Sequence, residues 1–265
     1  MSIWEALILG IIQGLTEFLP VSSSGHLELA KAIFGVETEE NLLFSLVLHL
    51  GTALSTMVVF RKYIGEVLGG LFRKPWNESW DFSAKVVLSM LPALAVGLLF
   101  KDEIEALFEG NILLVALMLL VTGVLLTLTW QVRHREGQEV SYGRAIIMGI
   151  AQAIAILPGI SRSGATIATG ILSGSSKEKA TQFSFLMVLP VIIGASILEL
   201  KDYLEAPASS QSIGWVPLLA GFLTAFLAGM VACQWMIGLV RKGKLLYFAL
   251  YCFAVGLIAL AFEIF

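Results

Sequence analysis

Six long apolar stretches constrain the fold of this chain more than any other feature of its sequence. A membrane-spanning helix takes roughly 20 predominantly apolar residues, and these stretches are of that order. They are Phe44–Phe60, Val86–Phe100, Ile112–Trp130, Phe183–Leu200, Trp215–Val240 and Leu245–Phe265. The composition agrees, since 57% of the residues are hydrophobic, 14% are charged and the mean hydropathy is +0.87. A soluble enzyme is excluded, and we expect an all-α polytopic membrane protein.

Charge and cysteine content exclude further classes. A net charge of −3 and a pI near 5.7 argue against nucleic acid as a partner, because phosphate binding needs a basic face. The two cysteines, Cys233 and Cys252, lie inside apolar stretches and form neither a disulfide framework nor a metal knuckle. The first residues lack the basic region and cleavage site of a signal peptide, so we expect them to be retained.

Two further apolar segments, Ile3–Val21 and Ala145–Leu157, end in short turns that contain proline, serine and glycine. The returning segments, Gly25–Phe34 and Gly164–Leu172, have about ten residues each, or about 15 Å of helix. This covers about half of a 30 Å hydrocarbon core. We therefore expect two re-entrant helical hairpins rather than full crossings.

The charged loops predict an orientation. The basic loops carry Arg61, Lys62, Arg73, Lys74 and Lys85, then Arg133, Arg135 and Arg144, and finally Arg241, Lys242 and Lys244. The loops between them are acidic and carry Glu37, Glu39, Glu40, Asp102, Glu103, Glu105, Glu109, Asp202 and Glu205. Basic loops in the cytoplasm give six crossings with both termini outside, provided that the hairpins do not cross.

The two broken segments resemble each other at a constant offset of 139 residues. The offset relates Gly10 to Gly149, Gln13 to Gln152, Ser22 to Ser161, Ser24 to Ser163 and Gly25 to Gly164. Each half then has one hairpin and three crossings, an odd number that inverts the second copy. We predict a single integral membrane domain (1–265) whose repeat halves, about 1–132 and 144–265, are joined by a short cytoplasmic linker. Chance matches among glycine, serine and leucine are the alternative, but the offset persists over about fifty residues.

The first turn offers a carboxylate, hydroxyls and an imidazole. Gln13 and Glu17 share one helix face, and a carboxylate in an apolar segment is a functional candidate, unless the neighbouring backbone merely satisfies it. The run Ser22, Ser23, Ser24, Gly25 and His26 follows Pro20 and begins the next helix. Hydroxyls at a helix N-terminus bind anions, although they also cap helices that bind nothing. His26 is spaced to reach the hydroxyl of Ser22 or Ser23 as an acid or base.

The second turn adds Arg162, between Ser161 and Ser163. A guanidinium at this depth needs an anionic partner, either phosphate oxygens or, alternatively, the carboxylate of Glu17. The offset pairs Ser23 with Arg162, so we expect the two turns to face each other with a hydroxyl on one side and a cation on the other. Of the other histidines, His49 is interpreted as a packed residue and His134 as a solvated one.

Together these residues indicate phosphoryl transfer in a membrane. A diphosphate carries more negative charge than one arginine and two helix dipoles offset. We therefore expect a divalent cation, with Glu17 as its protein ligand and Gln13 as a neutral helper.

The run from Gln13 to His26 (QGLTEFLPVSSSGH) resembles the first signature of the bacterial undecaprenyl-pyrophosphate phosphatases, the bacitracin-resistance family, and Pro158 to Thr166 (PGISRSGAT) resembles their second. The resemblance covers the whole chain. It implies hydrolysis of the C55 lipid diphosphate to the monophosphate carrier of peptidoglycan synthesis, in the bacterial plasma (inner) membrane. It also implies a divalent cation (Mg²⁺ or Ca²⁺) and a site that opens to the periplasmic or outer side.

By position, Glu17, His26 and Arg162 match the family's essential acid, histidine and arginine, and Ser23 matches its proposed nucleophile. Substrate-binding residues are then expected at Gln13, Ser22, Ser24, Gly25, Ser161, Ser163, Gly164 and Thr166. The first position of the family's acidic pair is glutamate or glutamine, and here it is Gln13, which weakens schemes in which two carboxylates hold the metal. The expected partners are the polyprenyl diphosphate and membrane lipids, and a homodimer is left open.

Two other functions compete with this interpretation. Inverted repeats with broken helices are also typical of secondary transporters, so the chain is alternatively a carrier that flips a lipid phosphate. A carrier does not require a serine nucleophile beside a histidine base, and a structural scaffold does not require polar residues at the hairpin tips. The sequence leaves open whether a serine or an activated water attacks the phosphorus.

Overall fold

The protein is a bundle of α-helices in a computed structural model that describes residues 1–34, 42–107, 111–132, 138–205 and 214–264, among which no strand occurs. The helices are α1 (Ile3–Phe18), α2 (Ser23–Phe34), α3 (Leu42–Val59), α4 (Arg61–Leu71), α5 (Glu78–Leu99), α6 (Lys101–Leu107), α7 (Ile112–Trp130), α8 (Tyr142–Ile154), α9 (Arg162–Leu172), α10 (Lys177–Glu205), α11 (Trp215–Arg241) and α12 (Leu245–Ile264).

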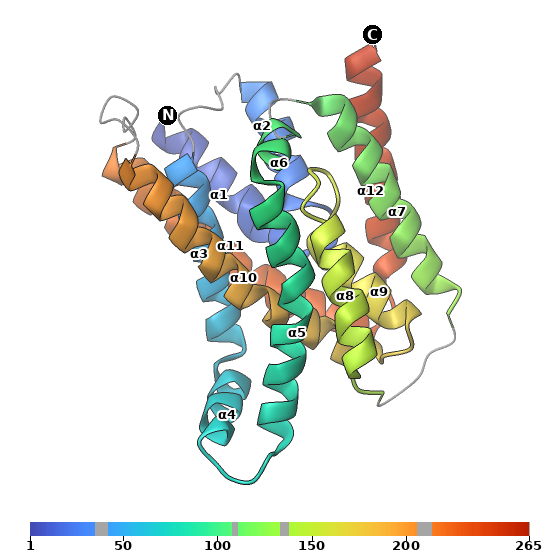
Figure 1. Ribbon diagram of the computed structural model, residues 1–265. Helices are drawn as coiled ribbons and strands as arrows, with labels where there is room; N and C mark the ends of the chain where they lie inside the picture. Colours follow the sequence, from blue (N-terminus) through green and yellow to red (C-terminus); the bar gives the residue numbers. More distant parts are fainter. Residues whose placement is uncertain (35–41, 108–110, 133–137, 206–213, 265) are drawn as a thin grey trace.

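The long apolar helices confirm a polytopic membrane protein. Among the described residues, α5, α7, α10, α11 and α12 are each long and apolar enough to cross a membrane. A sixth candidate is α3 taken together with α4, and these two helices are bent by 77° at their junction. The six predicted crossings thus correspond to α3, α5, α7, α10, α11 and α12. Both chain ends lie at the upper end of the bundle, and α4 lies at the lower end (Figure 1).

The structure corrects the predicted boundaries at the basic loop that follows α3. Residues 61–71 form α4 instead of loop, and α5 begins at Glu78, eight residues before the predicted start. Asn77 causes this early start, because its side chain accepts hydrogen bonds from the backbone N–H groups of Ser79 and Trp80. Some predicted loop charges lie outside the described residues, namely Glu37, Glu39, Glu40, Glu109, Arg133 and Arg135, as does His134.

The two broken segments form the helix pairs α1–α2 and α8–α9, each with an extended or turn segment between its helices. The first helix of each pair packs against a helix from the other half of the chain. In Figure 1, α1 runs down from the N-terminal end along α11, and α8 runs up from the opposite end along α5. Helices α7 and α12 also pack side by side across the halves. The halves are therefore interleaved.

Glycines allow these helices to approach closely. A Cβ atom on Gly10 of α1 would lie 2.6 Å from the carbonyl oxygen of Gly221 on α11. A Cβ atom on Gly149 of α8 would lie 2.4 Å from the carbonyl oxygen of Ser89 on α5. Small residues at such contacts are typical of helix packing in membranes, where van der Waals contact rather than the hydrophobic effect holds helices together. The two glycines are 139 residues apart, so the predicted offset coincides with equivalent packing.

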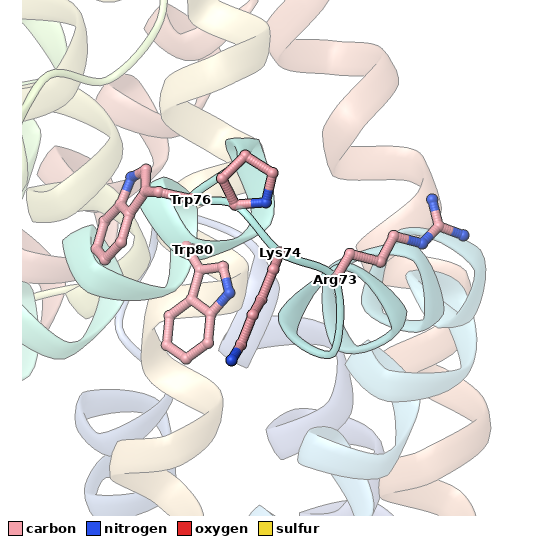
Figure 2. Close-up of a pocket in the computed structure, with 5 residues that line it drawn as sticks. Arg73, Lys74, Trp76 and Trp80 are labelled. Carbon is pink, nitrogen blue, oxygen red and sulfur yellow. The ribbon is translucent and has the colours of Figure 1, made fainter.

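The loop between α4 and α5 carries an aromatic and basic cluster. Trp76 and Trp80 stack with ring centroids 5.8 Å apart, and they line an open pocket of about 590 Å³ together with Arg73, Lys74 and Pro75 (Figure 2). Tryptophans and cations gather where a membrane protein meets the lipid headgroups. This loop therefore has the composition of a membrane–water interface.

The close approach of α8 to α5 generates a prediction. Gly149→Ala should lower the midpoint of thermal unfolding in detergent, because the added methyl meets backbone atoms that cannot rotate away. Overpacking of this kind costs about 1–3 kcal/mol. Gly194→Ala on α10 is the matched control, since a Cβ there meets nothing within 4 Å, and it should leave stability unchanged or slightly higher. Equal midpoints for the two variants would contradict the packing described for α8.

A candidate active site where two helical turns meet

The first turn is built on an unusual backbone conformation at Ser22. This residue has φ 70°, which lies in the left-handed region that residues other than glycine seldom adopt. Its hydroxyl accepts a hydrogen bond from the N–H of Gly25 at 3.2 Å and lies 3.3 Å from the hydroxyl of Ser24. The local strain is held by these contacts, which begin α2 at Ser23. Strain of this type is concentrated at functional sites.

The second turn repeats the hydroxyl contacts of the first, although Ser161 has φ −73° and is not left-handed. The hydroxyl of Ser161 caps α9 by accepting a hydrogen bond from the N–H of Gly164 at 3.0 Å, and it lies 3.2 Å from the hydroxyl of Ser163. Thr122 on α7 holds the turn, because its hydroxyl accepts from the N–H of Ser161 at 3.0 Å. Its single hydrogen faces the carbonyls of Met118 at 3.1 Å and Gly159 at 3.4 Å. The turn cannot shift without breaking these buried bonds.

The two turns touch each other. A Cβ atom on Gly25 would lie 3.2 Å from the Cα of Gly159, and one on Gly164 would lie 3.3 Å from the Cβ of Pro20. In addition, the hydroxyl of Ser163 donates to the carbonyl of Leu19 at 3.1 Å. The N-termini of α2 and α9 therefore meet, and helix N-termini favour bound anions.

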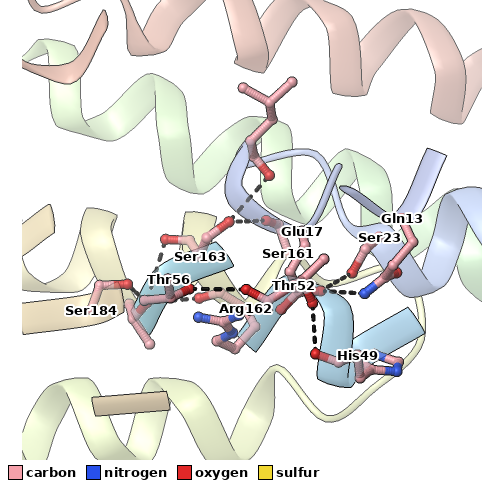
Figure 3. A network of polar contacts seen from close by, with 12 residues as sticks. Gln13, Glu17, Ser23, His49, Thr52, Thr56, Ser161, Arg162, Ser163 and Ser184 are labelled. Carbon is pink, nitrogen blue, oxygen red and sulfur yellow. Dashed lines mark hydrogen bonds and ion pairs between the residues drawn. The ribbon is translucent and has the colours of Figure 1, made fainter. Parts of the chain in front are cut away.

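Glu17 is the centre of the polar network between the turns (Figure 3). One carboxylate oxygen, Oε2, accepts hydrogen bonds from the Ser23 hydroxyl at 2.7 Å and from Nε2 of Gln13 at 3.1 Å. The other oxygen, Oε1, accepts from Nη2 of Arg162 in an ion pair. The carboxylate is 8% exposed. Sequence analysis gives the carboxylate of Glu17 as the alternative partner of Arg162, and the structure contains this salt bridge.

Two buried polar atoms of this network have no hydrogen-bond partner among the described residues. They are Nη1 of Arg162 and Oε1 of Gln13. A buried polar group without a partner costs free energy unless a ligand completes it. Nη1 is a charged donor suited to a phosphate oxygen, and Oε1 is a neutral oxygen suited to a hard cation. Both types of ligand atom are therefore available at the junction of the turns.

His26 is close in sequence to Ser23, but the structure directs its ring elsewhere. Nδ1 lies 2.8 Å from the carbonyl oxygen of Ser22, and Nε2 lies 2.8 Å from the hydroxyl of Tyr251 on α12. The hydroxyl of Ser23 donates to Glu17 instead. The structure thus brings Glu17, Ser23, Gln13 and Arg162 together, whereas the ring nitrogens of His26 contact Ser22 and Tyr251.

Two other predicted or considered residues lie at the edge of the site. Thr166 is buried behind it, where its hydroxyl is 2.6 Å from that of Ser184 and joins α9 to α10 rather than facing the turns. His49 bonds through Nδ1 to the carbonyl of Ser45 at 2.9 Å, as expected of a packed residue. Sequence analysis missed Thr122 and Tyr251, since nothing near either residue in the chain marks a contact with a distant turn.

The described residues contain no group of three or more histidine, cysteine, aspartate or glutamate side chains that could hold a metal ion on their own. A cation here would depend on one carboxylate, the orphaned amide oxygen of Gln13 and oxygens of a bound substrate. A diphosphate supplies such oxygens. The arrangement is therefore suited to an anionic phosphate ester together with a cation, not to a resident metal cluster.

Known proteins resemble this chain over nearly its whole length. Residues 6–258 match the family described as bacitracin resistance protein BacA. Proteins named undecaprenyl-diphosphatase from Christiangramia forsetii and Bacteroides fragilis are 57% and 48% identical, covering 99% and 98% of this chain and 98% of each relative. A protein of the same name from Carboxydothermus hydrogenoformans is 39% identical and covers 99% of this chain and 98% of its own length.

Proposed function

Because this chain belongs to the bacitracin resistance protein BacA family, we infer that it acts as an undecaprenyl-diphosphatase. It is a membrane hydrolase that converts undecaprenyl diphosphate to undecaprenyl phosphate and inorganic phosphate. The reaction returns the lipid carrier used in peptidoglycan synthesis and confers bacitracin resistance. Its substrate is a membrane lipid, in agreement with the apolar helices that enclose the site.

The observation that carries this function at the level of residues is the shared carboxylate of Glu17. One of its oxygens accepts a hydrogen bond from the hydroxyl of Ser23, and the other accepts one from the guanidinium of Arg162. A nucleophile, a proton acceptor and a phosphate-binding cation are thereby held within one network, and Nη1 of Arg162 is left for a phosphate oxygen.

We propose that Ser23 attacks the terminal phosphorus. Its proton passes to Glu17 as the bond from Oγ to phosphorus forms, and the bond from phosphorus to the bridging oxygen breaks to release undecaprenyl phosphate. Water then attacks the phosphoserine, the protons of the water leave with the inorganic phosphate, and Glu17 returns its proton to the Ser23 oxygen. Arg162 and the two helix N-termini stabilise negative charge on the phosphoryl oxygens. Water attacking directly, with Glu17 as its base, is the alternative.

The proposed cofactor is a divalent cation, Mg²⁺ or Ca²⁺. Gln13 and Glu17 would hold it, because the orphaned Oε1 of Gln13 and the carboxylate of Glu17 lie next to each other and hard cations prefer oxygen ligands. When bound, the cation would neutralise charge on the diphosphate and polarise its oxygens.

We further propose that α1–α2 and α8–α9 are re-entrant hairpins in an inverted-topology repeat. The cross-packing of α1 on α11 and of α8 on α5 supports this, as do the matching serine hydroxyl contacts of the two turns. A third observation concerns the carbonyls of Pro20 and Gly159, which the 139-residue offset pairs. Sγ of Cys252 on α12 lies 3.5 Å from the first, and the hydroxyl of Thr122 on α7 lies 3.4 Å from the second.

The proposed orientation places the basic ends of α4, α8 and α11 in the cytoplasm, with both termini outside. The protein then lies in the bacterial plasma (inner) membrane with its site open to the periplasmic or outer side. This orientation rests on charge alone, and a homodimer is neither required nor excluded by it.

The test of the function is phosphate release. Purified protein in detergent should release inorganic phosphate from a C55 diphosphate, a chelator should abolish the release, and added Mg²⁺ or Ca²⁺ should restore it. A carrier would bind the lipid and release no phosphate. Activity that persists after thorough chelation would contradict the proposed cation but not the hydrolysis.

Ser23→Ala should lower turnover by several orders of magnitude while substrate still binds, because the attacking oxygen is lost. Ser24→Ala is the control, since its hydroxyl lies near that of Ser22 and should contribute at most about tenfold. Turnover and lipid binding are measured separately. Appreciable activity in Ser23→Ala together with an inactive Glu17→Gln would identify water as the attacking group.

Arg162→Lys should lower kcat on the order of 100-fold or more, although the charge is kept. An ammonium cannot bond Glu17 and a phosphate oxygen at the same time through a planar fork. Arg61→Lys is the matched control, because Arg61 is exposed and bonds only to the carbonyl of Val58 among the described residues. If the lysine variant at 162 keeps most of the activity, Arg162 contributes bulk charge only.

The orientation is tested by single cysteines or tags on a background without Cys233 and Cys252. Labels at either terminus should react with an impermeant reagent added to intact cells whose outer membrane has been permeabilised. Labels in the loop between α4 and α5 should be protected until the cells are lysed. A protected N-terminus would make α1 a full crossing and would end the inverted-repeat proposal.

A further inference from the structure

The ring of His26 lies against a residue more than two hundred positions away in the chain. The hydroxyl of Tyr251 on α12 is 2.8 Å from Nε2 of His26. The two rings are also stacked, with centroids 5.5 Å apart and planes inclined by 11°. A hydrogen bond and a stacking contact together define both the position and the tilt of the imidazole.

The hydrogen-bond partners also define its protonation. Nδ1 of His26 lies 2.8 Å from the carbonyl oxygen of Ser22, and a carbonyl oxygen can only accept. Nδ1 therefore carries the hydrogen, so Nε2 of the neutral ring is the accepting nitrogen and Tyr251 donates to it. When Nε2 gains a proton, it can donate to the same hydroxyl oxygen, because a hydroxyl exchanges donor and acceptor roles without moving its ring.

Tyr251 has a neighbour on α12 that holds the same turn. Cys252 donates to the carbonyl of Pro20 at 3.5 Å. Two consecutive residues of α12 thus hold the two ends of the turn that contains the strained Ser22 and presents Ser23 to Glu17.

We propose that Tyr251 is a positioning residue for His26. It holds the His26 ring in place through the hydrogen bond at Nε2 and the stacking contact, and through the bond from Nδ1 to the Ser22 carbonyl it steadies the turn that carries Ser23. This inference rests on the proposed function, since it assigns Tyr251 a place in the hydrolysis. The geometric part, a tyrosine that fixes the position of the His26 ring, stands without it.

The experiment compares Tyr251→Phe with Tyr247→Phe in the full chain, reconstituted in lipid nanodiscs. The first change removes the hydroxyl and keeps the ring. The second is the matched control, one turn away on α12, where Tyr247 is 67% exposed and its ring lies near Lys244. The measurements are kcat and KM for phosphate release and the ¹⁵N NMR spectrum of histidine-labelled protein, in which His26 is assigned by its loss in His26→Gln.

The expected result is a kcat about 5- to 30-fold lower in Tyr251→Phe, the loss that follows from one or two kcal/mol, with KM little changed. The Nε2 resonance of His26 should shift in the same variant, and Tyr247→Phe should match the wild type in both respects. An unchanged His26 spectrum in Tyr251→Phe would overturn the proposal, whatever the activity. A shifted spectrum with wild-type kcat would overturn the catalytic part.

Failure of the proposed function is distinguishable from these outcomes. In that case the wild type itself would release no phosphate, while the NMR comparison would still report whether Tyr251 sets the state of the His26 ring.

Discussion

The ion pair between Glu17 and Arg162 is the contact on which the rest of the site depends. Each residue sits at the tip of a different helix pair, and neither charge can be left alone in an apolar interior. Removing one partner of a buried pair typically costs about 3–5 kcal/mol, because the other charge is stranded. The pair therefore does two things. It holds the turns together and keeps the carboxylate beside Ser23, so that stability and chemistry share the same atoms.

Most of the frame could be predicted from the sequence, because the bilayer imposes simple rules on length and polarity. The crossings at α7, α11 and α12 agree with prediction to within a residue at each end, since runs such as Ile112–Trp130 are bounded by polar residues. Glu17 and Arg162 could be found for the same reason, as charges at a depth where charge is costly. The start of α5 could not be located, because it depends on the side-chain cap of Asn77 within a loop rich in charges.

Within the site, the features that the sequence did not predict depend on contacts between residues far apart in the chain and on backbone conformation. Spacing along α2 suggests that His26 reaches a serine hydroxyl, but the left-handed conformation of Ser22 turns its carbonyl toward the imidazole instead. The role of Thr122 depends on contacts between α7 and a turn almost forty residues later, and that of Tyr251 on contacts across most of the chain. No periodicity encodes such contacts. The offset of 139 residues pairs serines that make the same hydroxyl contacts in the two turns, but it pairs Ser23 with Arg162 and Glu17 with Ile156. The polar residues between the turns therefore do not follow the offset.

The interleaving of the two halves has a consequence for how the protein is made. Helix α1 is among the first segments to leave the ribosome, yet its packing partner α11 and the α12 residues that hold its turn are among the last. Arg162 on α9 is made before them, but until α11 and α12 arrive the polar tip of α1–α2 lacks the helices that enclose it. Completion of the site is therefore the final event of biogenesis, so a chain truncated before α11 should be a target for membrane quality control rather than a partly active enzyme.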